Sequence, residues 1–90
     1  MQMEEVLGSK TRLKILKILS QVGELNVSEI ARRLGANHKT TIKHLRIFEN
    51  EGVLAHKTFG SIRMYRFNES SQKAKAIQNF IEAWEKAERH

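Results

Sequence analysis

Side chains suited to nucleic-acid recognition lie close together in the middle of this 90-residue chain. They are amides, imidazoles, hydroxyls and cations: Asn37, His38, Lys39, Thr40, Lys43, His44 and Arg46. Groups of these kinds make hydrogen bonds to base edges and to phosphate oxygens. No acidic residue occurs between Gly35 and Phe48, so no carboxylate there repels a polyanion. The stretch therefore indicates contact with double-stranded DNA.

The positive charge of the chain is concentrated in the same region. The net charge is +6, and residues 27–67 hold eight lysines and arginines against three glutamates, a net +5. The flanking parts, residues 1–26 and 68–90, are almost neutral. A basic centre between neutral ends is typical of a nucleic-acid footprint, and a solvated surface with incidental charge has the same composition.

The remaining reactive side chains form no catalytic or metal-binding pattern. The four histidines, at positions 38, 44, 56 and 90, fall on different predicted elements or on different faces of one helix. The chain has no cysteine and no aspartate, which excludes disulfides and thiolate metal sites. No glycine-rich loop suited to phosphate binding occurs. We expect no enzymatic activity, no metal and no other cofactor.

Length and hydropathy indicate one soluble domain over residues 1–90. A chain of this size buries a small core, which a partner chain would enlarge. No apolar run approaches the roughly 20 residues that span a bilayer. The acidic start of the chain lacks the apolar centre of a signal peptide. We therefore expect a cytoplasmic protein that is not bound to a membrane.

Three helices are predicted in the first half of the chain. Apolar residues at helical spacing predict a helix over residues 10–22 and a short second helix over residues 27–34. A third helix begins near His38 and runs to residue 50 or 51. The small Ala31 allows close approach of the second and third helices, and Gly35 suits a sharp turn between them. Such a pair is typical of a helix-turn-helix, whose second helix enters the major groove.

Two runs rich in β-branched and aromatic residues predict a hairpin after the third helix. They are residues 53–58 and 62–67, and the loop Phe59–Ser61 between them contains a glycine. Lys57 and Arg63 lie on this hairpin, and we expect them to contact phosphates or the minor groove.

A last helix, predicted over residues 71–89, is more apolar than one small domain requires. Its apolar stripe consists of Ile77, Phe80, Ile81 and Trp84. This stripe either packs on its own domain or meets its twin in a homodimer. The small core favours the homodimer, with 71–89 as a dimerisation helix. The N-terminal Met3, Val6 and Leu7 are expected to join the interface.

The predicted order of elements is α-α-α-β-β-α, a mainly α fold with a small β-hairpin. The segments Val27–Gly35, Lys39–Thr41, His44–Arg46 and Glu51–Leu54 make the chain resemble winged-helix repressors of the ArsR type, the archaeal members most of all. In that family the hairpin is a wing. The resemblance implies a winged helix-turn-helix and a homodimeric transcriptional regulator that acts as a repressor.

The chain departs from the metal-sensing members of that family at one clear position. They carry Glu-Leu-Cys-Val-Cys where this chain has Glu-Leu-Asn-Val-Ser at residues 24–28, so both thiol ligands are missing. The sequence indicates no effector. Ile42 is also unusual, because it lies near the predicted groove face. It either touches a thymine methyl group or extends the core stripe.

Three functions stay open at this point. The leading one is a sequence-specific regulator. The second is an architectural, chromatin-type protein that coats DNA with little base readout. The third is a protein-interaction winged helix that does not bind DNA, and the acid-free stretch argues against it.

Overall fold

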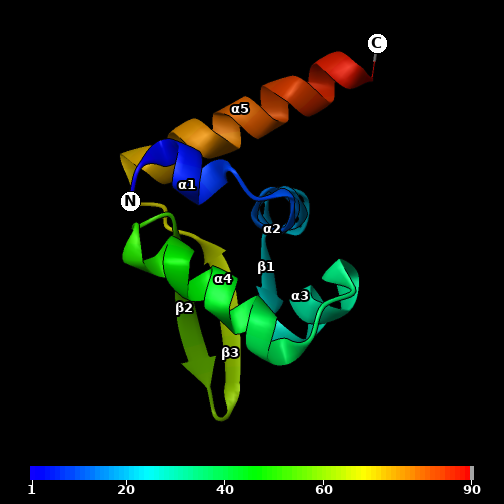
Figure 1. Ribbon diagram of the computed structural model, residues 1–90, viewed down its shortest axis with the longest axis vertical. Helices are drawn as coiled ribbons and strands as arrows, with labels where there is room; N and C mark the ends of the chain where they lie inside the picture. The colour runs from blue at the N-terminus through cyan, green and yellow to red at the C-terminus, as the bar shows by residue number, and fades with distance from the viewer. Residues whose placement is uncertain (90) are drawn as a thin grey trace.

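A computed structural model describes residues 1–89, which fold into five helices and three strands (Figure 1). In chain order they are α1 (Met3–Leu7), α2 (Lys10–Val22), β1 (Glu24–Asn26), α3 (Val27–Leu34), α4 (His38–Asn50), β2 (Leu54–Phe59), β3 (Ile62–Phe67) and α5 (Gln72–Glu88). The predicted winged helix-turn-helix is confirmed. Two short elements, α1 and β1, were not predicted.

Side-chain caps fix where the four longer helices begin. In each case an oxygen of the residue before the helix accepts a hydrogen bond from the backbone N–H three positions later. The capping residues are Ser9 for α2, Asn26 for α3, Asn37 for α4 and Ser71 for α5. At the other end of α3, Gly35 adopts a left-handed conformation with φ of 68°. The sharp turn between α3 and α4 therefore follows from local sequence.

The strands form one antiparallel sheet in the order β1-β3-β2. The predicted three-residue hairpin loop is wrong, because Phe59 pairs with Ile62 and leaves only Gly60 and Ser61 in the loop. Gly60 has φ of 62°, the positive value that the first position of such a two-residue loop requires. The third strand, β1, pairs Leu25 with Tyr65 and closes the other edge of β3.

The core lies around α2, which runs between α5 on one side and the sheet, α3 and α4 on the other (Figure 1). Large side chains of α2, α3, α4 and β3, and one residue just before β2, are fully buried in it. They include Ile15, Leu16, Leu19, Ile30, Leu45, Phe48, Val53 and Tyr65. The helical periodicity of α2, α3 and α4 accounts for most of these residues.

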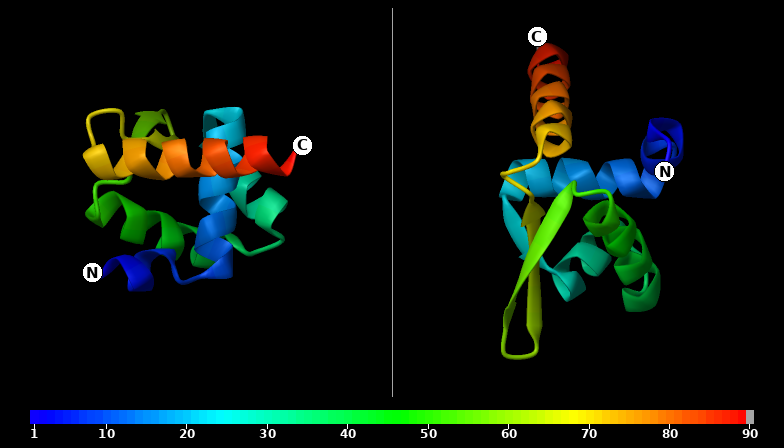
Figure 2. Two further views of the ribbon diagram at one scale, coloured as in Figure 1. Left: turned by 90° about the horizontal axis from the view of Figure 1, so that it is seen from above. Right: turned by 90° about the vertical axis from the view of Figure 1, so that its left-hand side faces the viewer.

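The hairpin and the C-terminal end of α5 lie at opposite ends of the molecule, whose longest dimension is 40 Å (Figures 1 and 2). In the right-hand view of Figure 2 the hairpin projects beyond α3 and α4. Within residues 1–89, no helix has both the length and the apolar character needed to cross a membrane.

Candidate nucleic-acid interface

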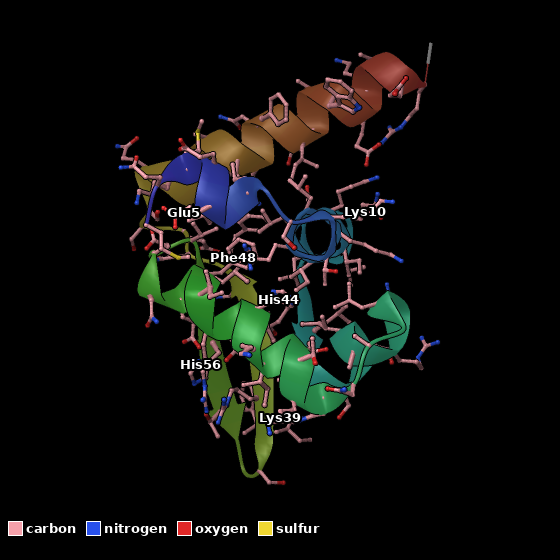
Figure 3. All side chains as sticks on the ribbon, viewed as in Figure 1. Glu5, Lys10, Lys39, His44, Phe48 and His56 are labelled. Atoms are coloured by element: carbon pink, nitrogen blue, oxygen red, sulfur yellow. The ribbon has the colours of Figure 1, made fainter. Side chains whose placement is uncertain are left out.

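The first half of α4 presents a polar, cationic face to the surface. His38, Lys39, Thr40, Lys43 and Arg46 are all exposed, and together with Ile42 they line a shallow groove along the helix. The opposite face carries Thr41, Leu45 and Phe48, which are fully buried. Figure 3 shows Lys39 at the exposed end of α4 and Phe48 on its inner side. The 3.6-residue period thus separates a core face from an accessible one.

Asn37 is the N-terminal cap of α4. Its Oδ1 accepts a hydrogen bond of 2.8 Å from the backbone N–H of Thr40. Its backbone carbonyl accepts a second, also 2.8 Å, from the Thr41 hydroxyl. Asn37 therefore fixes the direction in which the exposed side chains of the first turn project.

His44 is separated from the exposed face of α4. It is half-buried, and its Nδ1 lies 3.2 Å from Nη1 of Arg12 on α2. Burial lowers the pKa of His44, and the positive charges of Arg12 and Lys43 lower it further. The structure thus groups His44 with α2 and not with the other predicted DNA-binding residues.

The two predicted wing residues lie on opposite faces of the hairpin. In the register of β2 and β3, Lys57 is opposite Met64 and Thr58 is opposite Arg63. Since successive side chains alternate between faces, Lys57 and Arg63 point in opposite directions. Arg63 shares its face of the hairpin with Tyr65, whose hydroxyl is bonded to Glu49 of α4, so Arg63 faces the helix. Lys57 is exposed on the outer face.

Ile42 combines the two roles that the sequence left open. It is partly buried and packs against the core cluster. It also lines both grooves that border the first half of α4. An apolar atom is thus accessible between the cations of α4 and the wing.

A side-chain network that the sequence did not indicate connects α4 to the wing. The buried Tyr65 hydroxyl donates a hydrogen bond of 2.8 Å to Oε1 of Glu49. The other oxygen of that carboxylate lies 2.6 Å from Nδ1 of His56 on β2. Burial raises the pKa of Tyr65, and the hydrogen bond to Glu49 adds to the rise. Glu49 is the first acid after the acid-free stretch, which is the only local signal for its role.

The region that carries this geometry matches a known family. The profile described as "Bacterial regulatory protein, arsR family" matches residues 9–55, which span α2, α3, α4 and the start of β2. The chain belongs to the arsR family.

Two relatives of this arsR-family chain are regulators of resistance genes. It is 30% identical over 83 residues to the arsenical resistance operon repressor of Escherichia coli, covering 92% of this chain and 70% of that protein. It is 29% identical over 77 residues to a homologue of the cadmium resistance transcriptional regulatory protein CadC of Staphylococcus aureus. That match covers 86% of this chain and 64% of the length of the cadmium regulator. These relatives are bacterial, and the likeness to archaeal members stays a prediction.

A solved structure shares both the fold and part of the sequence. It is the homodimeric winged helix-turn-helix DNA-binding domain of a possible ArsR-family transcriptional regulator from Mycobacterium bovis. The two are 26% identical with a TM-score of 0.74, covering 96% of this chain and 75% of that one. The arsR-family fold thus extends over nearly the whole chain, including α5.

In this arsR-family chain the predicted apolar stripe of α5 divides into two parts. Ile81 is buried in the core of its own domain, and Ile77 is half-buried against it. Phe80 and Trp84 are 64% and 60% exposed, with ring centroids 6.0 Å apart. With Leu13 of α2 they line an apolar groove between α2 and α5. This second part has no apolar cover within a single chain.

The short helix α1 continues the apolar surface beside the start of α5. Met3 is exposed, Leu7 is half-buried and Val6 lies in the core. These three side chains and Ile77 line a second apolar groove. The exposed residues predicted for a dimer interface therefore border two apolar grooves, each of them partly lined by α5.

Metal-sensing members of the family have their cysteines in the segment that matches residues 24–28. In this chain the same segment forms β1 and the start of α3. Oδ1 of Asn26 accepts a hydrogen bond of 2.8 Å from the N–H of Glu29 and so caps α3. Among residues 1–89, no three His, Cys, Asp or Glu side chains gather where they could hold a metal ion. His90, the last of the four histidines, lies outside the described residues.

Proposed function

We propose that this protein is a homodimeric, sequence-specific repressor that binds double-stranded DNA and reads it with α4. The observation that carries the proposal is the acid-free exposed face of α4, set on a helix whose opposite face is buried. The relationship to a repressor in Escherichia coli and to a DNA-binding domain from Mycobacterium bovis supports it.

In the proposed complex, α4 enters the major groove by its first turns. His38, Lys39, Thr40 and Lys43 then reach base edges, and Asn37 holds the helix start in place. Arg46, farther along the same face, and Lys57 and Arg63 on the wing meet phosphates. A bound repressor of this kind blocks the DNA to which transcription proteins must bind.

The dimer is proposed to form through α5, with α1 contributing to the interface. Phe80 and Trp84 are large aromatic side chains without cover in one protomer, and aromatics of this size dominate interface energetics. The Mycobacterium bovis domain, similar over 96% of this chain, is homodimeric. Two copies would present two α4 helices to half-sites roughly 34 Å apart, or a multiple of that distance.

The proposal includes no catalytic role, no metal and no bound cofactor. The described histidines lie on the exposed start of α4, against Arg12 and against Glu49, in three separate surroundings. The proposed partner places the protein where the DNA is, which in bacteria is the cytoplasm.

Binding-site selection from random duplexes, followed by competition at two salt concentrations, tests the proposal. A selected duplex should bind at least about 10³-fold more tightly than random DNA. With about six phosphate contacts per dimer, three from each protomer, binding should weaken by about 10³-fold between 50 and 200 mM salt. Equal affinity for selected and random DNA would favour the architectural protein. Absence of binding at low salt would favour the protein-interaction module.

A further inference from the structure

The tip of the wing carries two large apolar side chains at the surface. Phe59 ends β2 and Ile62 begins β3, and they are directly opposite each other in the hairpin register. They are 59% and 51% exposed, so neither contributes much to the core. The two loop residues between them, Gly60 and Ser61, are small. The apolar pair is therefore the bulkiest part of the tip.

The charge of the wing identifies the kind of partner that the tip fits. Residues 53–68 contain no acid and three cations, Lys57, Arg63 and Arg66. Because side chains two positions apart share a face, Lys57 lies on the same face of the hairpin as Phe59. A positive charge thus stands about 7 Å along the strand from the apolar tip. A positive charge beside an apolar tip suits double-stranded DNA, which has anionic phosphates outside and apolar base faces inside.

The tip is also continuous with the proposed DNA-reading surface. Ile62 and Arg63 line one groove together with His38 and Ile42 of α4. The hairpin projects past α3 and α4 at the end of the molecule opposite the C-terminus (Figure 2). A duplex that receives α4 in its major groove therefore has its neighbouring minor groove within reach of the tip.

We propose that Phe59 and Ile62 form a wedge that enters the minor groove beside the half-site read by α4 and partly unstacks one base step. This proposal rests on the proposed function. Apolar side chains inserted between base steps are a known way in which proteins kink DNA toward the major groove. The exposed apolar area of the wedge would be covered by base faces and sugar edges. Lys57 would hold the adjacent phosphate.

A wedge of this kind also adds sequence preference without any hydrogen bond to a base. Pyrimidine–purine steps unstack at lower cost than other steps, so the flank of the operator should contain one. The wing would then contribute to specificity through the deformability of DNA, while α4 contributes through base edges.

The double variant Phe59→Thr with Ile62→Thr tests the wedge, because threonine, like Phe and Ile, is enriched in strands and it removes most of the apolar surface. The DNA is the duplex selected with the wild-type protein, carrying 2-aminopurine in the flank and dyes at both ends. We expect affinity to fall by about tenfold with an unchanged salt slope, since no phosphate contact is lost. The rise in 2-aminopurine fluorescence and the DNA bend seen with the wild type should disappear.

Two comparisons make the result specific. Val22→Thr replaces another exposed apolar residue, 44% exposed at the end of α2, and should leave affinity, fluorescence and bend unchanged. Lys57→Ala should make the salt slope shallower. If the double variant binds and bends DNA as the wild type does, the wedge is refuted. The exposed apolar tip would then be assigned to contact with a protein partner. A wild type without preference for any duplex would instead refute the proposed function.

Discussion

Nη1 of Arg12 lies 3.2 Å from Nδ1 of His44 and links the start of α2 to the middle of α4. The same guanidinium donates to the carbonyls of Val6 and Glu5 at the end of α1, at 2.8 and 2.6 Å. A guanidinium can only donate, so Nδ1 of His44 accepts and carries no proton in this arrangement. Arg12 therefore connects α1, at the proposed dimer interface, with the helix proposed to read DNA.

This contact predicts a loss of stability on acidification. The pKa of His44 is lowered in the folded protein, by burial first and then by Arg12 and Lys43, so the unfolded chain binds the proton more tightly. The neutral imidazole contributes fully above the ordinary pKa of about 6.5. Its contribution is lost as the pH falls through the lowered pKa. The unfolding free energy, measured with urea at pH 7.5 and at pH 5, should differ less between the two pH values for His44→Asn than for the wild type.

The matched control for this experiment is His38→Asn. His38 is exposed at the start of the same helix and does not contact Arg12. Because this variant keeps the contact between His44 and Arg12, the loss of stability on acidification that this contact predicts should persist in it. If His44→Asn loses as much stability on acidification as the wild type, His44 is not the responsible group.

The Tyr65–Glu49 hydrogen bond should stabilise the junction of α4 with the wing. Replacing Tyr65 with Phe removes a donor to a charged acceptor and keeps the buried ring. We expect the unfolding free energy to fall by about 1.5 kcal/mol. Glu49→Gln weakens two contacts of the carboxylate, with the Tyr65 hydroxyl and with Nδ1 of His56, and should therefore cost more than Tyr65→Phe. Chemical denaturation at one fixed protein concentration measures both, and a smaller loss for Glu49→Gln would contradict this assignment.

The features that sequence reasoning predicted correctly depend on neighbours in the chain. The bounds of α4 follow from the cap at Asn37 and the stop near Gly52, and its two faces follow from helical periodicity. The features that it missed depend on residues far apart. His44 meets Arg12 across 32 positions, and Tyr65 meets Glu49 across 16. No local pattern reports such contacts.

The sheet and α5 also have features that local sequence patterns could not predict, because they depend on contacts between distant parts of the chain. β1 has only three residues and becomes a strand because β3 is there to pair with it. The stripe of α5 has one periodicity, but the core covers only one edge of it, so Ile81 is buried while Phe80 stays exposed. Periodicity fixes which residues share a face of a helix, and only the tertiary arrangement decides how much of that face is covered.

The division of the α5 stripe yields a prediction about assembly. Phe80→Ala with Trp84→Ala should convert a dimer to a monomer, because both side chains are mostly exposed within one chain. The apparent stability of the wild type should rise with protein concentration, and that dependence should vanish in the variant. Sedimentation at micromolar concentration measures the first effect. A wild type that sediments as a monomer would refute the proposed interface.

Ile81→Ala is the matched comparison on the same helix. This side chain is buried in its own domain, so its truncation should lower the unfolding free energy by about 2–5 kcal/mol. The loss should be present at every protein concentration. If Ile81→Ala and the double variant of Phe80 and Trp84 had the same effects on dimer formation and on the unfolding free energy, the α5 stripe would not be divided into a buried part and an exposed part.

The last prediction separates base readout from docking on phosphates. Thr40 and Lys43 lie on the exposed face of the first turns of α4, where side chains reach base edges. Replacing both with Ala should reduce the preference for the selected duplex over random DNA, by about 1–3 kcal/mol for each lost base contact. Replacing Lys57 and Arg63 with Ala should weaken binding to both duplexes about equally and make the salt slope shallower.

The contrast arises because base edges differ between sequences whereas phosphates do not. None of the four side chains belongs to the buried core, so neither variant should unfold the protein, and thermal melting checks this.

Since Lys57 and Arg63 lie on opposite faces of the hairpin, their single variants should also differ. Arg63 faces α4 and stays close to the half-site, whereas Lys57 reaches the flank, so shortening the duplex at the flank should abolish the effect of Lys57→Ala alone. If the α4 variant loses affinity equally for selected and random DNA, then α4 does not read the sequence, and the protein binds DNA as an architectural protein does.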